Sequence, residues 1–248
     1  MRAWSLTDRG RVRKQNQDAC SYLQFELGDG TEILAAVVCD GMGGAKAGNI
    51  ASEIAVETFM EELRKDFYAP SVTDVQMLCA VKTANRLIYE KAQSDPDYEG
   101  MGTTLVAAVT DGSHVTVANV GDSRCYLLRD GKLEQVTEDH SMVMEMVKAG
   151  IITREQMRTH PMRNVITRAV GTDRIIQVDS DELERREGDV WLICSDGLHG
   201  LVDEETIKSV LEDTDLEQAA DRLMQLALEE GGGDNISLVL IRDGEAGV

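Results

Sequence analysis

The chain has 248 residues, of which 42% are hydrophobic, and this length and composition can build one large α/β domain or two smaller ones. Its 25 Lys and Arg residues stand against 45 Asp and Glu residues, which gives a formal net charge of −20 at pH 7. Since binding to a phosphate backbone depends on cationic side chains, this charge argues against a nucleic-acid partner.

The sequence shows no signal for a membrane or an oxidising compartment. The first ten residues, MRAWSLTDRG, hold no apolar core of a signal peptide, and no apolar run approaches the roughly 18 residues of a membrane-spanning helix. The five cysteines are scattered and odd in number, and no Cys-x2-Cys or His-x3-His spacing for zinc occurs. We therefore expect a cytoplasmic protein with reduced thiols and no membrane insertion.

Periodicity along the chain predicts short strands and several longer helices. Runs rich in Val, Ile and Leu, bounded by Gly or Asp, predict strands at residues 32–40, 103–111, 114–122, 124–130, 174–180, 189–196 and 235–243. Apolar residues at every third or fourth position predict helices at residues 48–66, 73–93, 141–149 and 203–229. The last helical stretch is expected to split within EDTDLEQ, at 212–218.

The order of these elements indicates the fold class. Strands follow one another as neighbours, whereas helices come in two pairs, one after residue 47 and one near the end. This order favours hairpin-linked antiparallel sheets covered by helix pairs over a repeating strand–helix–strand pattern. The predicted fold is α+β, a four-layer α/β/β/α sandwich. With no low-complexity linker and no repeat, one domain over residues 1–242 is favoured, followed by a frayed tail at 243–248.

Aspartates stand at the ends of several predicted strands, namely Asp40, Asp122, Asp196 and Asp234. One such residue alone is more often a turn residue, because Asp-Gly and Gly-Asp are common turn dipeptides. Asp40 and Asp196, however, each follow an almost continuous apolar strand, and carboxylates massed at one rim repel one another unless a cation compensates. Oxygen-rich sites of this kind select magnesium or manganese, and Gly41 leaves room for its carbonyl to reach such an ion.

Other motifs for phosphate or metal chemistry fail at defined positions. The Gly-Lys pair at 131–132 is followed by Leu133 rather than by the Ser or Thr of a P-loop. An EF-hand loop beginning at Asp179 needs a glycine and an acid where the chain has Glu184 and Val190. No cysteine is followed six residues later by the arginine that a cysteine phosphatase requires.

Motifs spread over the chain carry a resemblance to a known family. In order they are GRVRKQNQDA, VVCDGMGG, GTTLVAAV, ANVGDSRCYLLRDGKLEQVTEDHS, HPMRNVITRAVG, WLICSDGL and GGGDNISLVLI. Together they resemble the metal-dependent type 2C protein serine/threonine phosphatases, and the bacterial branch in particular. The resemblance implies a phosphoprotein phosphatase, a sandwich of two antiparallel sheets flanked by helix pairs, and a two-metal centre at one end of the sheets.

The resemblance also implies the ligands of two core ions, manganese or magnesium. Asp40 is expected to bridge the two ions, and the carbonyl of Gly41 to bind one of them. Asp196 and Asp234 are expected to hold the other ion. Asp18 is expected to orient metal-bound water.

Two further residues match family positions beside this pair of ions. Asp122 matches an aspartate associated with a third, weaker metal site that shares Asp196. Arg13 matches the arginine that grips the substrate phosphate, and a planar guanidinium can donate two parallel hydrogen bonds to it. Taken alone, Arg13 is better explained by an exposed surface charge, but its place five residues before Asp18 within the motif favours phosphate binding.

The implied reaction is hydrolysis of phosphoserine and phosphothreonine by a metal-bridging hydroxide, without a covalent phosphoenzyme. Cations about 3.5–4 Å apart lower the pKa of a bridging water and clamp the phosphate oxygens. Some members carry His where this chain has Met42, and a thioether cannot donate a proton to the leaving oxygen. A metal-bound water is then favoured as the acid over His140, His160 or His199. Gln17 is a second departure, because many members have Glu there.

Residues 138–172 resemble the flap of the bacterial family, a small helical insertion beside the metal site. The arginines of this region and just beyond it are Arg154, Arg158, Arg163, Arg168 and Arg174. In a strongly negative chain they favour attraction of a phosphorylated segment, and a solvated helical surface explains them equally well.

Two alternative functions stay open at this point. One is a catalytically weak phosphoprotein-binding module that retains the metal site, and the other is a domain that metals merely stabilise. The expected partners are phosphorylated proteins, either the targets of a serine/threonine kinase or the kinase itself. The expected oligomeric state is a monomer.

Overall fold

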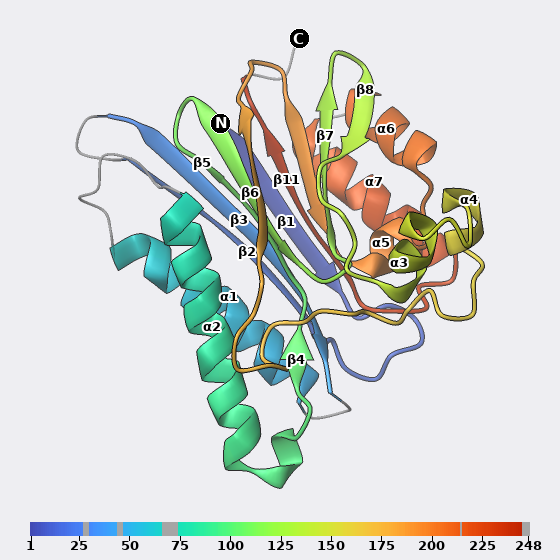
Figure 1. The fold of residues 1–248 in the computed structure, drawn as a ribbon. Helices are drawn as coiled ribbons and strands as arrows, with labels where there is room; N and C mark the ends of the chain where they lie inside the picture. Colours follow the sequence, from blue (N-terminus) through green and yellow to red (C-terminus); the bar gives the residue numbers. More distant parts are fainter. Residues whose placement is uncertain (27–29, 44–46, 66–73, 214, 245–248) are drawn as a thin grey trace.

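The structure is a computed structural model that describes residues 1–26, 30–43, 47–65, 74–213 and 215–244. Two antiparallel sheets pack face to face (Figure 1). Sheet 1 has the strand order β1 (Arg2–Asp8), β11 (Ile236–Arg242), β10 (Val190–Cys194), β7 (Arg124–Arg129) and β8 (Lys132–Gln135). Sheet 2 has the order β2 (Asp18–Glu26), β3 (Glu32–Met42), β5 (Leu105–Thr110), β6 (His114–Val120) and β9 (Asp179–Glu184), and β4 (Gly102–Thr103) pairs with β3.

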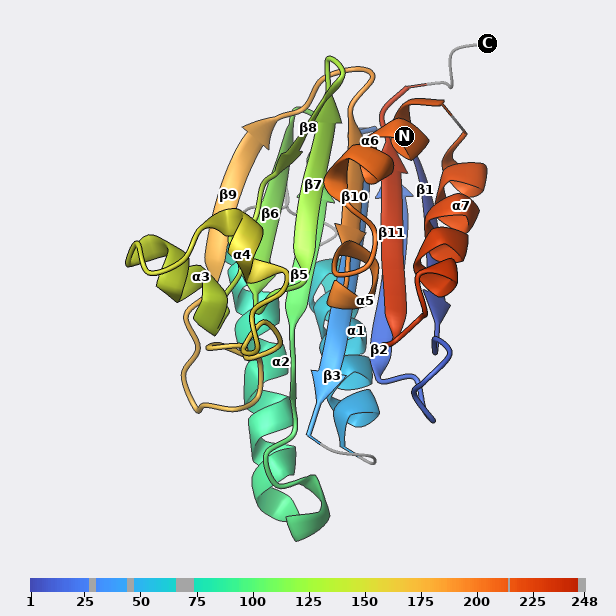
Figure 2. The same ribbon diagram turned by 90° about the vertical axis from the view of Figure 1, so that its right-hand side faces the viewer.

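Helices cover the outer face of each sheet, as the two views show (Figures 1 and 2). Sheet 2 carries α1 (Gly48–Lys65) and α2 (Asp74–Ser94), which is followed by the 3-10 turn η1 (Pro96–Tyr98). Sheet 1 carries α5 (Asp196–His199), α6 (Glu204–Asp213) and α7 (Leu216–Glu229). The short helices α3 (Met142–Lys148) and α4 (Arg154–Met157) lie to one side of the sheets. The four-layer α/β/β/α prediction is confirmed.

Strand periodicity explains how one strand serves two cores. Because side chains alternate between the faces of a strand, β3 places Leu34 and Val38 between the sheets and Ile33 and Val37 against the helices. All four side chains are fully buried. The run LAAVVC reads as continuously apolar because both faces of β3 are covered.

The structure corrects the prediction of a strand at 174–180. The strand there is β9, which starts only at Asp179, and Ile175 before it is 87% exposed. The strand forms where β6 offers backbone partners, since His114–Asn119 pair with Asp179–Glu184. Because β9 is an edge strand, pairing rather than hydrophobicity sets its position. The strands β1, β2 and β8 were not predicted.

Asp243, the first residue of the predicted tail, packs against the segment after β9. Asp243 is buried and accepts hydrogen bonds from Arg185 Nε at 2.5 Å and Nη2 at 2.6 Å. Residues 245–248 of the predicted tail lie outside the described residues. Among the described helices, none combines the length and the apolar composition needed to cross a membrane.

Candidate metal centre and active site

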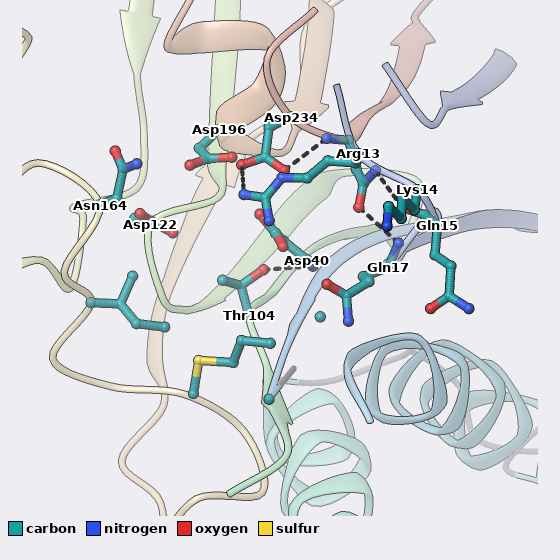
Figure 3. Close-up of a pocket in the computed structure, with 15 residues that line it drawn as sticks. Arg13, Lys14, Gln15, Gln17, Asp40, Thr104, Asp122, Asn164, Asp196 and Asp234 are labelled. Atoms are coloured by element: carbon teal, nitrogen blue, oxygen red, sulfur yellow. Dashed lines mark hydrogen bonds and ion pairs between the residues drawn. The ribbon is translucent and has the colours of Figure 1, made fainter. Parts of the chain in front are cut away.

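Six residues, five aspartates and one glycine, are expected to take part in metal binding. Five of them line one pocket at the end of the sandwich, together with Arg13. The pocket has a volume of about 560 Å³, and these lining residues are Arg13, Asp40, Gly41, Asp122, Asp196 and Asp234 (Figure 3). Asp40 comes from β3 in sheet 2, whereas Asp196 and Asp234 adjoin β10 and β11 in sheet 1. The site therefore exists only once the two sheets have packed together.

Asp18, the sixth expected metal residue, lies directly opposite Asp40 in the β2–β3 ladder, behind the pocket lining. It is buried, and the hydroxyl of Ser195 donates to its Oδ2 at 2.7 Å. Ser195 in turn accepts from the backbone N–H of Ser237 at 3.0 Å. Asp18 is thus held from sheet 1 while it belongs to sheet 2.

Burial raises the pKa of four of the carboxyl groups, those of Asp18, Asp40, Asp122 and Asp196, and neighbouring carboxylates raise it further. The pKa rises to about 7 for Asp18, to about 8 for Asp122 and to about 6 for Asp196. The pKa of Asp40 is raised well above its usual range, first by burial and then by the charge of Asp18. Such a cluster is suited to a divalent cation, whose binding replaces protons on the carboxyl groups.

Two buried oxygens strengthen this fit to a cation. Within the described residues, Oδ1 of Asp18 and Oδ1 of Asp196 are buried without a hydrogen-bond partner. A buried carboxylate oxygen without a partner is costly, and a hard cation satisfies it. In the part of the chain that the structure describes, no group of three or more His, Cys, Asp or Glu side chains is already arranged as a metal ligand set.

The backbone around Asp40 is fixed by Thr103 at the end of β4 and by Thr104 between β4 and β5. Thr104 accepts from the Asp40 N–H at 2.9 Å through its hydroxyl, and the hydroxyl of Thr103 donates to the Asp40 carbonyl at 2.9 Å. A Cβ on Gly41 would lie 2.1 Å from the carbonyl oxygen of Gly48 and 2.5 Å from that of Gln17, so packing requires glycine there. The motif GTTLVAAV therefore serves to hold Asp40 in place.

Arg13 and the loop around it are anchored to the other side of the pocket. Arg13 Nη2 donates to Oδ2 of Asp234 at 2.6 Å. The buried Asn235 accepts from the N–H of Gln17 at 2.8 Å and donates to the carbonyls of Arg9 and Gln15, both at 2.9 Å. The amide of Asn235 thus shapes the loop that presents Arg13.

The histidines considered as proton donors do not line this pocket. His140 accepts from the N–H of Gly121 at 3.0 Å through Nδ1, and burial lowers its pKa. His199 contacts the carbonyl of Asp122 through Nε2, and burial, followed by the charge of Arg124, lowers its pKa to about 3. Met42 lines the pocket.

The segment expected to be a flap contains α3 and α4, with a small core of its own. That core is built from Val143, Met144 and Met157. Asn164 and Ile166, which follow α4, reach the lining of the metal pocket. The segment is therefore positioned to contact whatever enters the site.

The flap arginines lie apart from one another. Arg154, Arg158 and Arg163 line a neighbouring groove of about 410 Å³. Arg168 instead donates from Nη1 to Oδ1 of Asp179 at 2.6 Å, and Arg174, in the segment before β9, lines a separate pocket together with residues of α2. The expected cluster of five cations is thus divided, and three of its members face the groove beside the site.

Sequence reasoning missed the residues that support the acids. Two of them could have been found from the sequence. Asn235 directly follows the expected ligand Asp234, and Thr104 belongs to the Gly-Thr-Thr motif at 102–104. Ser195 precedes Asp196, yet nothing in the sequence links it to Asp18, which is 177 residues away in the chain. Such contacts follow from the packing of the two sheets.

Comparison with known proteins agrees with this architecture. The family model described as protein phosphatase 2C matches residues 8–231. The chain is 38% identical over 244 residues to the serine/threonine phosphatase stp of Listeria welshimeri, covering 97% of this chain and 95% of that protein. The crystal structure of the Mycobacterium tuberculosis serine/threonine phosphatase PstP/Ppp has a TM-score of 0.87 at 35% identity, covering 98% of this chain and 99% of that one.

A further solved structure is the catalytic domain of the serine/threonine phosphatase PstP in complex with two manganese ions. It has a TM-score of 0.85 at 35% identity and covers 96% of each chain. These similarities extend over both sheets and both helix layers. The chain belongs to the protein phosphatase 2C family and is a protein serine/threonine phosphatase.

Proposed function

We propose that this phosphatase hydrolyses phosphoserine and phosphothreonine in proteins with divalent cations held at the end of the sandwich. The observation that carries the proposal is the meeting of Asp40, Asp196 and Asp234 in one pocket, beside Arg13. The core ligands are these three carboxylates and the carbonyl of Gly41. The complex of PstP with two manganese ions supports manganese as a suitable ion, and magnesium suits the same oxygen ligands.

The proposed role of the cations is to supply positive charge to the negatively charged phosphate and to the attacking water. Bound at the carboxylates, they neutralise the phosphate oxygens and produce a nucleophile from water at neutral pH. A third, weaker cation site is proposed at Asp122 and Asp196, which line both the metal pocket and the adjoining groove.

Arg13 is proposed to bind the substrate phosphate. Its side chain is 49% exposed at the pocket, and its pKa is raised by the hydrogen bond to Asp234, so it stays charged. A guanidinium can offer two parallel donors to phosphate oxygens. Phosphate binding then requires Arg13 to share or exchange its bond to Asp234.

Asp18 is proposed to orient water from behind the pocket. Ser195 occupies Oδ2 of Asp18, which leaves Oδ1 as the oxygen available toward the site. Gln17 lines the pocket nearby, but as an amide it adds no charge.

Several wider assignments belong to the same proposal. The substrates are phosphorylated proteins, targets of a serine/threonine kinase or the kinase itself, and the protein acts as a cytoplasmic monomer in signalling. Residues 1–242 form one phosphatase domain in which 138–172 act as a flap over the substrate.

The test is phosphate release by the purified protein. With manganese, an aryl phosphate and a phosphothreonine peptide should both be hydrolysed, and a chelator should stop the reaction on each. A phosphoprotein-binding module would bind the peptide in the presence of metal but release no phosphate. A domain that metals only stabilise would neither bind nor hydrolyse it.

A further inference from the structure

We propose that His199 is a positioning residue that fixes the spacing of Asp122 and Asp196, and so controls the weaker cation site formed by those two acids. The inference rests on the proposed function, which assigns that site to Asp122 and Asp196. It concerns a residue outside the metal pocket lining.

His199 moves together with Asp196 because both belong to the single turn α5. Asp196 opens this turn and His199 ends it, and residues three apart in a helix lie on the same face. The turn is closed by the bond from the Gly200 N–H to the Asp196 carbonyl at 2.8 Å. A Cβ on Gly197 would lie 1.9 Å from the carbonyl oxygen of Asn235, so the turn is also packed tightly against the start of β11.

The other end of the link is the backbone of Asp122. His199 Nε2 lies 3.0 Å from the Asp122 carbonyl oxygen, and because a carbonyl only accepts, Nε2 carries the proton. Asp122 belongs to the short crossing between β6 of sheet 2 and β7 of sheet 1. The bond therefore ties this crossing to the helical turn that carries Asp196.

An ion pair lies close to the imidazole of His199. Next to it, Arg124 donates to Asp139 through Nε at 2.9 Å and through Nη2 at 2.7 Å, which forms a two-pronged ion pair. His199 lines the same groove as this pair. Loss of the His199 hydrogen bond would leave the Asp122 carbonyl without this partner. The distance between the Asp122 and Asp196 side chains would then no longer be fixed by this contact.

The direct test is a manganese titration of the metal-stripped protein by calorimetry. The wild type should show a tight class of sites and a weaker one. In His199→Ala the tight class should persist while the weaker one loses about tenfold or more in affinity, as is usual when a group that orients a metal ligand is removed. His199→Gln, which keeps an N–H donor, should recover most of that loss.

The matched control is His114→Ala, at the opposite end of β6 from Asp122, which should leave both classes unchanged. A double-mutant cycle with Asp122→Ala should show that the effects of His199→Ala and Asp122→Ala on the weaker class are not additive. Kinetics add a second readout, because His199→Ala should lower kcat on a phosphothreonine peptide while KM changes little.

Several results would overturn the inference. The first is a wild-type titration that shows no weaker class of manganese sites. The second is a His199→Ala titration in which the affinities of both classes are unchanged. The third is an equal loss of manganese affinity in both classes that His199→Gln does not recover. If the wild type binds manganese in both classes and His199 controls the weaker one, the inference stands even where no phosphate is released. Failure of the proposed function is thus distinguished from failure of this role.

Discussion

Arg13 Nη2 and Oδ2 of Asp234 lie 2.6 Å apart, so the residue proposed to bind phosphate is paired with a residue proposed to bind metal. Their side chains are 49% and 30% exposed, and ion pairs of that exposure contribute little to stability. The pair is therefore free to exchange when a cation or a phosphate enters. A cation bound at Asp234 would compete with Arg13 for this carboxylate, and Arg13 would then be available to the substrate phosphate.

Replacing Asp40 or Asp234 by Asn is expected to abolish manganese-dependent hydrolysis. An amide removes the negative charge that holds the cations and leaves the remaining carboxylates less able to bind them. Phosphate release from an aryl phosphate measures the effect. Asp181→Asn, an exposed acid on β9, is the control and should keep full turnover. Near-normal turnover in either site variant would remove that residue from the centre.

The stability of the metal-stripped protein is expected to fall as pH rises from about 4, the ordinary pKa of an aspartate, to about 8. The folded-state pKa values of Asp18, Asp122 and Asp196 are raised to about 7, 8 and 6. A raised pKa gives stability that is complete below the unfolded-state pKa and lost as pH rises through the folded-state pKa. Melting temperatures measured from pH 5 to 9 check this prediction. For a chain of this size, each kcal/mol of lost unfolding free energy lowers the melting temperature by roughly 2–4 °C.

Asp122→Asn should flatten that pH dependence and raise the melting temperature of the metal-stripped protein at pH 8. The amide removes a buried charge that neighbouring carboxylates repel. The same substitution should reduce the increase in melting temperature that manganese causes. A pH profile identical to that of the wild type would contradict the proposed repulsion.

Arg13→Ala is expected to lower kcat/KM for phosphomonoesters roughly ten- to hundredfold, the usual cost of losing a charge-assisted hydrogen bond. Manganese affinity should not fall, because Arg13 is not a proposed metal ligand and its removal leaves Oδ2 of Asp234 open to the cation. Arg13→Lys should recover only part of the loss, since an ammonium lacks the two-pronged geometry. Arg9→Ala, an exposed cation in the same loop, is the control. Unchanged kcat/KM in Arg13→Ala would return Arg13 to a surface role.

Asp122→Ala is expected to slow the chemical step in a way that depends on the leaving group. Since Met42 supplies no proton, we attribute protonation of the leaving oxygen to water at the weaker cation site. The loss should be severe for a phosphothreonine peptide, whose alkoxide needs a proton, and mild for an aryl phosphate with an acidic phenol. Equal losses on both substrates would reject this role.

Asn235→Ala is expected to destabilise the protein by about 1–3 kcal/mol, because it leaves buried backbone groups of the Arg13 loop without partners. Urea unfolding measures the change, and kcat/KM should fall with it as Arg13 loses its position. Asn49→Ala, a half-buried asparagine on α1, serves as the control. A variant with normal stability and normal kcat/KM would show that the three bonds of Asn235 do not hold the loop.

The sequence by itself determined the layers and the chemistry of the acids. Its alternating and continuous apolar runs predicted most strands, because burial on one or both faces leaves a direct record in residue type. Its motifs resemble those of the type 2C phosphatases, and this resemblance predicted that Asp40, Asp196 and Asp234 share one metal site. These features are local, and local features can be read along the chain.

Only the tertiary structure decided which residues support that site and where the sheet edges lie. Ser195 reaches Asp18 and Asn235 holds the Arg13 loop only because sheet 1 and sheet 2 pack face to face. The start of β9 at Asp179 was set by backbone pairing with β6, while the more apolar Ile175 stayed exposed. Contacts between residues far apart in the chain, and hydrogen bonds of the backbone, depend on position in space and leave little trace in residue type.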